Sequence, residues 1–305
     1  MMIYAYCAAI LRSKGDTRRP LLILVCSGII KVGINLLFVC VFGMGVAGVA
    51  IATIIANVLN SGSLVFILTR EEGPFKLNLR RLTIKKEHFI RILKIGVPAG
   101  VQGMVFSFSN VCIQSAINGF GSDAIAGSAA ALNFEYFSYF VLNAFGQTAV
   151  TFTSQNFGAG NAERCKKVFL ISMVMGTVAM MICNAGFFLG RNALLLIFTS
   201  DPNVLPWSLV RTSHVLIFQW IACSYELSGQ CLRGMGHSIL PAVFSMLGSC
   251  VLRIVWIGTI FQTVGTFEML MNVYPVSWVI TGIATLIAYA IIVRKEYRRM
   301  EEPRL

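Results

Sequence analysis

Charged residues are scarce in this sequence, and acidic ones are rarer than basic ones. Only 12% of the residues are charged, with 13 Asp and Glu against 25 Lys and Arg, whereas 56% are hydrophobic. This balance lies far outside that of a soluble globular domain, so we interpret the chain as a membrane protein. Strict alternation of apolar and polar residues is missing, which disfavours a membrane β-barrel and leaves helices as the spanning structure. The predicted fold class is all-α, a polytopic membrane helix bundle.

The motifs of familiar enzymes are missing as well. The three histidines do not form HExxH, and the sequence contains neither GxSxG nor a Walker A glycine run. The nine cysteines are odd in number and never spaced as CxxC, which argues against a disulfide framework or a metal site. We therefore predict no cofactor and no metal, and transport that is either passive or driven by an ion gradient. An intramembrane enzyme acting through Glu135 and Glu226 is the weaker alternative.

Eight apolar runs are long enough to cross a bilayer as helices, which takes about 20 residues each. The opening MMIYAYCAAIL is too short to span and lacks the basic leader and cleavage pattern of a signal peptide, so we interpret it as a helix stub. The eight predicted spans are Leu21–Phe42, Gly45–Leu68, Ile95–Ile117, Ala124–Val150, Val168–Leu189, Leu205–Gln230, Ile239–Phe261 and Met271–Val293.

Basic residues gather in the segment 70–94 and in the tail 294–305. By the positive-inside rule these segments face the cytoplasm, and the predicted location is the plasma membrane. The pattern predicts an N-terminal helical remnant at 1–69, a basic connector at 70–94, a C-terminal six-helix lobe at 95–293 and the tail. A connector that binds acidic lipid or RNA is an alternative; we predict the bilayer, and no nucleic acid, as a partner.

One loop signature occurs twice. LRSKGDTRRP at Leu11–Pro20 reappears as LRGMGHSILP at Leu232–Pro241, with Leu, Arg, Gly and Pro in the same register. The repeat predicts two parallel halves of six helices, related by an axis along the membrane normal. On this arithmetic the first half is incomplete by about four helices and would begin roughly 125 residues upstream of Met1.

Polar side chains recur at helical spacing within the predicted spans. Such faces either hydrogen-bond to neighbouring helices or line an aqueous cavity, and we predict a cavity. The predicted cavity-lining residues are Asn110, Gln114, Tyr139, Asn143, Gln147, Gln219, Gln230, Lys31, Asn35, Asn57 and Arg253.

Four ionisable residues lie deep inside these spans: Glu135, Glu226, Lys31 and Arg253. A charge at the centre of a spanning helix costs roughly 2.5 to 3.5 kcal/mol, so such residues mark pathways, relays or ion pairs. We predict that Glu226, and after it Glu135, binds the coupling cation. Burial raises the proton affinity of a carboxylate and a nearby cationic ligand lowers it, so such a group can bind either a proton or the ligand. The two cations could instead be structural partners of the glutamates.

Several motifs together resemble the multidrug and toxic compound extrusion (MATE) transporters. They are the repeated LRxxGxxxxP loop, GMGVAGVAIAT at Gly43–Thr53, IGVPAGVQ at Ile95–Gln102 and QNFGAGNAERCKK at Gln155–Lys167. The resemblance implies two six-helix bundles around a cleft and cation-coupled export of organic, often cationic, compounds by alternating access. This chain would then contain helices five to twelve.

The sequence also departs from that family. The first helix, which carries a coupling aspartate in some members, is absent, and the helix at Ile95–Ile117 has no acid, with Phe106 where one would stand. An aspartate of the tenth helix would align near Ala222, one turn before Glu226. Proton and sodium coupling both stay open. A lipid-linked sugar flippase, favoured by basic residues such as Lys31 and Arg253, and an inactive fragment are the alternative functions.

Overall fold

The structure of the chain is a computed structural model that describes residues 2–79, 83, 85–199 and 201–301. Residues 80–82 and 84 of the predicted connector and 302–305 of the predicted tail lie outside the described residues. The described secondary structure is helical throughout, without strands. Contacts divide the chain into an N-terminal unit, Met1–Lys85, and a C-terminal unit, Lys86–Leu305.

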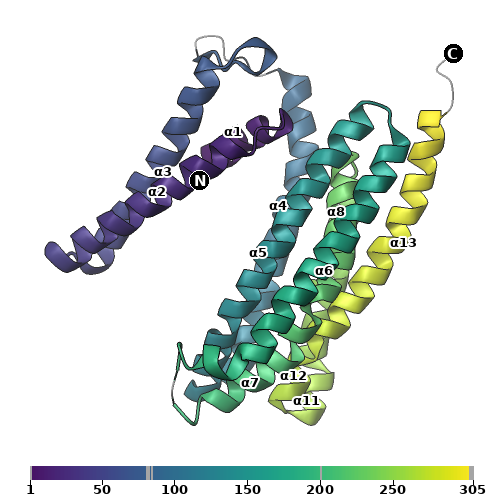
Figure 1. The fold of residues 1–305 in the computed structure, drawn as a ribbon. Helices are drawn as coiled ribbons and strands as arrows, with labels where there is room; N and C mark the ends of the chain where they lie inside the picture. Colours follow the sequence, from purple (N-terminus) through teal and green to yellow (C-terminus); the bar gives the residue numbers. More distant parts are fainter. Residues whose placement is uncertain (1, 80–82, 84, 200, 302–305) are drawn as a thin grey trace. The chain divides into compact units, whose positions relative to one another are not determined.

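In the N-terminal unit, α1 (Met2–Ser13) and α2 (Arg18–Leu36) both pack against α3 (Gly45–Arg70), and α2 and α3 lie side by side in Figure 1. A π-helical turn, η1 (Leu37–Val41), ends α2, and a 3₁₀ turn, η2 (Gly73–Phe75), follows α3. Cys7, Ala8 and Leu11 of α1 meet Leu64 and Leu68 of α3 in a small buried cluster. The short first helix is therefore an integral part of this unit.

An acidic side chain joins the ends of these helices. Glu71, directly after α3, accepts a hydrogen bond from Lys14 at 2.5 Å and another from Arg19 of α2. The hydrogen bonds from Lys14 and Arg19 hold the pKa of the Glu71 carboxyl below its usual range. The ion pairs thus tie the turn between α1 and α2 to the end of α3.

The C-terminal unit is built on long helices that run alongside one another in Figure 1. Its core joins residues of most helices, including Ile113, Leu142, Met180 and Leu227. Its elements are α4 (Lys86–Asn118), α5 (Ser122–Gly158), α6 (Ala162–Leu195), α7 (Leu205–His214), η4 (Leu216–Ala222), α8 (Cys223–Gly234), α9 (Ile239–Ser245), η5 (Met246–Val251), α10 (Leu252–Gly258), α11 (Ile260–Val264), α12 (Phe267–Met271) and α13 (Val273–Glu301).

Six helical segments of the described residues are long and apolar enough to cross a membrane. They are Arg18–Val41, Gly45–Arg70, Lys86–Asn118, Ala162–Leu195, Ile239–Val264 and Phe267–Arg299. Of the eight predicted spans, Ala124–Val150 is wholly helical within α5 but is not among these six. Large apolar side chains such as Ile29, Leu170 and Ile182 are exposed on the long helices, as expected where lipid is the solvent.

The predicted span Leu205–Gln230 is wrong as a continuous helix. The structure divides it into α7, the 3₁₀ segment η4 and α8. A 3₁₀ residue turns the chain by about 120° rather than 100°, so side chains after the break face another direction than an unbroken helix predicts. An unbroken helix would place Gln219 and Glu226 on one face, and the 3₁₀ segment, which contains Gln219, changes their angular spacing.

The two copies of the loop signature adopt the same local structure. In the first copy the Gly15 amide donates to Arg12 and the Asp16 amide to Leu11, at 2.9 and 3.0 Å. In the second copy Gly236 donates to Arg233 and His237 to Leu232, both at 2.9 Å. The two glycines have φ of 93° and 90°, a left-handed conformation that side chains rarely adopt. The glycine in each signature therefore ends a helix and lets the next one begin.

Candidate cavity in the C-terminal unit

A cavity of about 510 Å³ lies among α4, α5, α7, η4, α8, α10 and α13. Its volume falls within the range of pockets that hold small organic molecules, about 300 to 1,000 Å³. Its aromatic lining consists of Phe106, Tyr136, Tyr139, Tyr225, Tyr274 and Trp278. Its polar lining consists of Asn110, Gln114, Glu135, Arg211, Gln219 and Arg253. A few polar groups set among aromatic rings are typical of a small-molecule site.

Irregular helix accompanies the cavity on two sides. The 3₁₀ segment η4 contributes Gln219 and Ala222 to the lining, and the π-helical segment η5 ends immediately before α10, whose second residue is Arg253. Backbone that leaves the α-helical pattern at membrane depth is tolerated where it is buried in protein or lines a cavity. Both interruptions therefore fall beside the cavity, as is frequent for 3₁₀ and π segments at functional sites.

Glu135 and Arg211 form a buried ion pair in the cavity wall. The Arg211 Nε and Nη2 donate to the two Glu135 carboxylate oxygens at 2.6 and 2.9 Å, and Nη1 donates to the Ser128 hydroxyl at 2.6 Å. Arg211 is 2% exposed and Glu135 8%. This fork of two hydrogen bonds is the strongest arrangement of the two groups, and it neutralises both charges in their buried position.

Gln219 is held against the same helix turn. Its side-chain nitrogen donates to the Glu135 main-chain oxygen at 3.0 Å, whereas its side-chain oxygen is buried without a hydrogen-bond partner among the described residues. Buried acceptors are nearly always satisfied, by protein, water or ligand. The oxygen of Gln219 is thus a buried acceptor in the cavity wall without a partner among the residues that the structure describes.

Arg253 has a different environment from Arg211. It is 1% exposed, its Nε donates to the Ser277 hydroxyl at 3.2 Å, and its guanidinium lies over the rings of Tyr274 and Phe106 at 4.6 and 5.3 Å. Its Nη1 has no hydrogen-bond partner, and no ion pair to it occurs in the described part of the chain. Aromatic faces stabilise a cation without neutralising it. Arg253 is therefore a buried cation whose charge is not compensated by a carboxylate contact.

The predicted site residues separate into three groups. Around the cavity lie Asn110, Gln114, Glu135, Tyr139, Gln219 and Arg253. In the same unit but outside the lining are Asn143, Gln147, Glu226 and Gln230. Glu226 is half-buried, and its carboxylate accepts a hydrogen bond from the Gln230 side chain at 2.8 Å.

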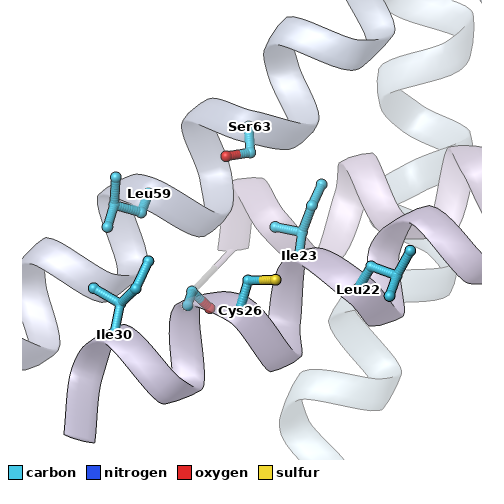
Figure 2. A pocket seen from close by; sticks show the side chains of 7 residues that line it. Leu22, Ile23, Cys26, Ile30, Leu59 and Ser63 are labelled. Carbon is cyan, nitrogen blue, oxygen red and sulfur yellow. The ribbon is translucent and has the colours of Figure 1, made fainter. Parts of the chain in front are cut away.

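Lys31, Asn35 and Asn57 belong to the N-terminal unit. A pocket of about 210 Å³ in this unit is lined by Leu22, Ile23, Cys26, Ser27, Ile30, Leu59 and Ser63, so these three residues do not line it. Figure 2 shows this pocket from close by. Ser27 Oγ donates to Asn60 at 2.6 Å and joins α2 to α3. Serine and asparagine act here as a bridge between helices, the alternative role that the sequence left open for such residues.

Arg211 is a cavity residue that the sequence pattern did not single out. One alternative from the sequence makes Arg253 a structural partner of a glutamate, whereas in the structure Glu135 pairs with Arg211. The signal was available, because Arg211 lies inside the predicted span Leu205–Gln230. No group of metal-binding side chains occurs among the described residues.

Comparison with known proteins agrees with this architecture. The sequence model of the MatE family matches residues 98–259. A protein of Thermotoga maritima named "Probable multidrug resistance protein NorM" is 25% identical over 258 residues, which is 83% of this chain and 55% of that protein. The "FAD transporter" of Shewanella oneidensis is 28% identical over 208 residues, covering 65% of this chain and 44% of that protein.

Among solved structures, a crystal structure of the Vibrio cholerae MATE transporter VcmN matches with a TM-score of 0.87 and 18% identity, covering 97% of this chain and 67% of that chain. This likeness shows the fold. The chain spans about half the length of the curated relatives it matches, for example 55% of the first of them. Because the family model matches more than half of the chain, the apolar helical protein described above belongs to the MatE family of membrane transporters.

Proposed function

We propose that this protein exports small organic compounds across the plasma membrane by alternating access, as a secondary active multidrug transporter driven by a proton or sodium gradient. The observation that carries the proposal is the aromatic and polar cavity of about 510 Å³ within a chain of the MatE family. A cavity of this size suits drug-like molecules. A lipid-linked sugar flippase is not favoured, because the similar curated proteins include drug-resistance proteins and no flippase among those compared above.

The proposed topology has eight spans and two parallel halves, with the connector at 70–94 and the tail at 294–305 in the cytoplasm. The similar backbone of the two loop signatures supports a repeat, and the density of Lys and Arg supports the orientation. Domain boundaries at 69 and 94, and a six-helix lobe at 95–293, remain part of this proposal.

Glu226 is the proposed cation-coupling residue. Its carboxylate is half-buried and bonded to a neutral partner, Gln230, so it is free to bind a proton or a sodium ion. Glu135 is the second candidate, but both of its oxygens are bound by Arg211, and a coupling ion would have to displace that guanidinium. Antiport requires that the ion and the substrate bias the conformations differently.

Transport is tested in an efflux-deficient bacterial host that expresses the chain. Accumulation is followed for cationic, neutral and anionic aromatic compounds, and for FAD, because one relative is named as its transporter. We expect lower accumulation of at least one compound than in the empty host, and loss of the difference when an ionophore collapses the gradients. Equal accumulation with and without the protein for every compound would reject export.

Coupling is tested with Glu226→Gln in the same host. We expect loss of gradient-driven export with expression and thermal stability close to the parent, because Gln keeps the shape but cannot titrate. Glu268→Gln is the matched control, since Glu268 lies in the short helix α12 and does not line the cavity. Export at the parental rate across the pH range would make Glu226 a structural residue.

A further inference from the structure

The charges around the cavity do not balance. Three formally charged side chains are among the described residues that line it: Glu135, Arg211 and Arg253. The first two neutralise each other through two hydrogen bonds, which leaves Arg253 as the surplus positive charge. Glu226 does not line the cavity and is bonded to Gln230. Among the described lining residues the uncompensated charge is therefore positive, and Glu226 acts electrostatically on the lining residues Tyr139 and Tyr225 from outside the lining.

Burying an unpaired guanidinium within a membrane segment is unfavourable, and such residues mark binding sites or pathways. The Ser277 hydroxyl and the two aromatic rings satisfy part of Arg253, but its Nη1 has no partner in the described part of the chain. A guanidinium with a free nitrogen matches the geometry of a carboxylate, phosphate or sulfonate oxygen. An oxyanion would supply both the missing hydrogen-bond acceptor of Nη1 and a counter-charge for Arg253.

The residues around Arg253 indicate which other chemical groups the ligand carries. Trp278 and Tyr225 contribute rings to the same cavity, which favour a planar aromatic body. The unpartnered side-chain oxygen of Gln219 is an acceptor for an N–H or O–H group on the ligand. Arg211 cannot take the role of Arg253 without breaking its fork with Glu135.

We propose that this cavity binds aromatic organic anions, and that Arg253 recognises their oxyanion group. The proposal deepens the proposed function by naming a substrate class, and it rests on that function only for the step of transport. The buried charge, the two hydrogen-bonding atoms without partners in the described chain and the aromatic lining support the binding step.

The test is equilibrium dialysis of the purified chain in lipid nanodiscs against three naphthalene probes of equal size: naphthoate, naphthamide and naphthylmethylammonium. We expect naphthoate to bind about tenfold or more tightly than naphthamide, the gain typical of a charge-assisted hydrogen bond, and the ammonium probe to bind most weakly. This comparison needs no variant, so it does not depend on whether a substitution folds. Equal binding of the three probes, or a preference for the cation, would refute the proposal.

Variants then assign the selectivity to one residue. Arg253→Gln should reduce naphthoate binding to the level of naphthamide and leave naphthamide binding within about twofold, whereas Arg253→Lys should keep part of the preference. Arg191→Gln is the matched control, because Arg191 also lies in a long apolar helix over a ring, that of Phe188, but does not line the cavity. Retained preference for naphthoate in a folded Arg253→Gln protein would place the anion site elsewhere.

A competition experiment with chloride distinguishes a site for small inorganic anions from one for organic anions. Full displacement of naphthoate at physiological chloride would overturn the organic-anion assignment.

Failure of this inference differs from failure of the proposed function. Anion binding without export in the host would reject transport and keep the site. Export of cations alone, with no binding of naphthoate, would keep transport and reject the site.

Discussion

Arg211 stabilises the C-terminal unit only as one half of a pair. Removing two charges from water costs several kcal/mol per ion, and the cost is offset when the geometry is good and the remaining donors are satisfied. Both conditions hold here, because the fork to Glu135 uses two donors and Ser128 takes a third. The pair also joins α7 to α5 beside the cavity. We interpret it as a positioning device for the cavity wall.

Glu135→Gln should destabilise the protein strongly. It leaves the buried Arg211 without its counter-charge, and breaking a buried pair in this way costs about 3 to 5 kcal/mol. The measurement is thermal or denaturant-induced unfolding of the purified protein in detergent.

The double variant Glu135→Leu, Arg211→Met is the control for this prediction. It removes both charges at similar volume and should recover most of the lost stability, because no buried charge remains unpaired. A Glu135→Gln protein as stable as the parent would show that water or lipid already solvates Arg211.

At the scale of elements, close approach between helices is set by small residues. A Cβ atom on Gly127 of α5 would lie 2.7 Å from the Val204 carbonyl oxygen and 2.7 Å from the Trp207 Cβ. Ser208 Oγ donates to the Gly127 carbonyl at 2.9 Å at the same contact. Backbone contact of this kind replaces the hydrophobic drive that is missing between helices in lipid. It also fixes the register in which Arg211 meets Glu135.

Gly127→Ala is therefore expected to destabilise the unit by about 1 to 3 kcal/mol, the usual cost of overpacking. Gly186→Ala in α6 is the matched control, because a Cβ there meets nothing within 4 Å. Unfolding of both variants in detergent is the measurement. Equal stability of the two would mean that α5 and α7 separate easily.

The ion pairs at the end of α3 predict a pH dependence of the N-terminal unit. The pKa of Glu71 is lowered by Lys14 and Arg19, so its contribution to stability is fully present above the usual carboxyl pKa of 4.5 and is lost as pH falls through the lowered pKa. Protection of the α1–α2 turn, measured by hydrogen exchange, should therefore be greater in the parent than in Glu71→Gln at neutral pH.

The difference between parent and Glu71→Gln should shrink towards zero in strong acid, where the parent carboxyl is protonated. Glu72→Gln changes an exposed neighbouring carboxylate and serves as the control. A difference that persists unchanged into strong acid would assign the effect to shape rather than charge.

For the whole molecule, the placement of charge predicts the orientation in the membrane. A single cysteine at Lys76, in a background without the nine native cysteines, should be shielded from an impermeant thiol reagent in intact cells. One at Ser122, at the start of α5, should react. The opposite labelling pattern would reverse the topology. Permeabilised cells, in which both positions should react, control for burial.

Composition and local pattern were enough to predict the class, and a resemblance of motifs indicated the family. Apolar runs of spanning length specify helices because lipid leaves the backbone no other hydrogen-bond partners, and helix ends follow from local signals such as the left-handed Gly15 and Gly236. The motifs carried the resemblance to MATE transporters, and the family match bears it out. Helix formation, helix ends and family motifs depend on residues that are close in the sequence, so they can be predicted from the sequence.

Tertiary structure alone decided the site. Arg211 and Glu135 lie 76 residues apart, and no local pattern states which glutamate an arginine will meet. The 3₁₀ segment η4 turns Gln219 into the cavity and leaves Glu226 outside its lining, although an unbroken helix would have given them one face. Arg253 is left without a carboxylate because Arg211 holds Glu135. Which charge is neutralised and which remains depends on packing between distant helices, and that packing leaves Arg253 as the unpaired charge among the described residues of the cavity lining.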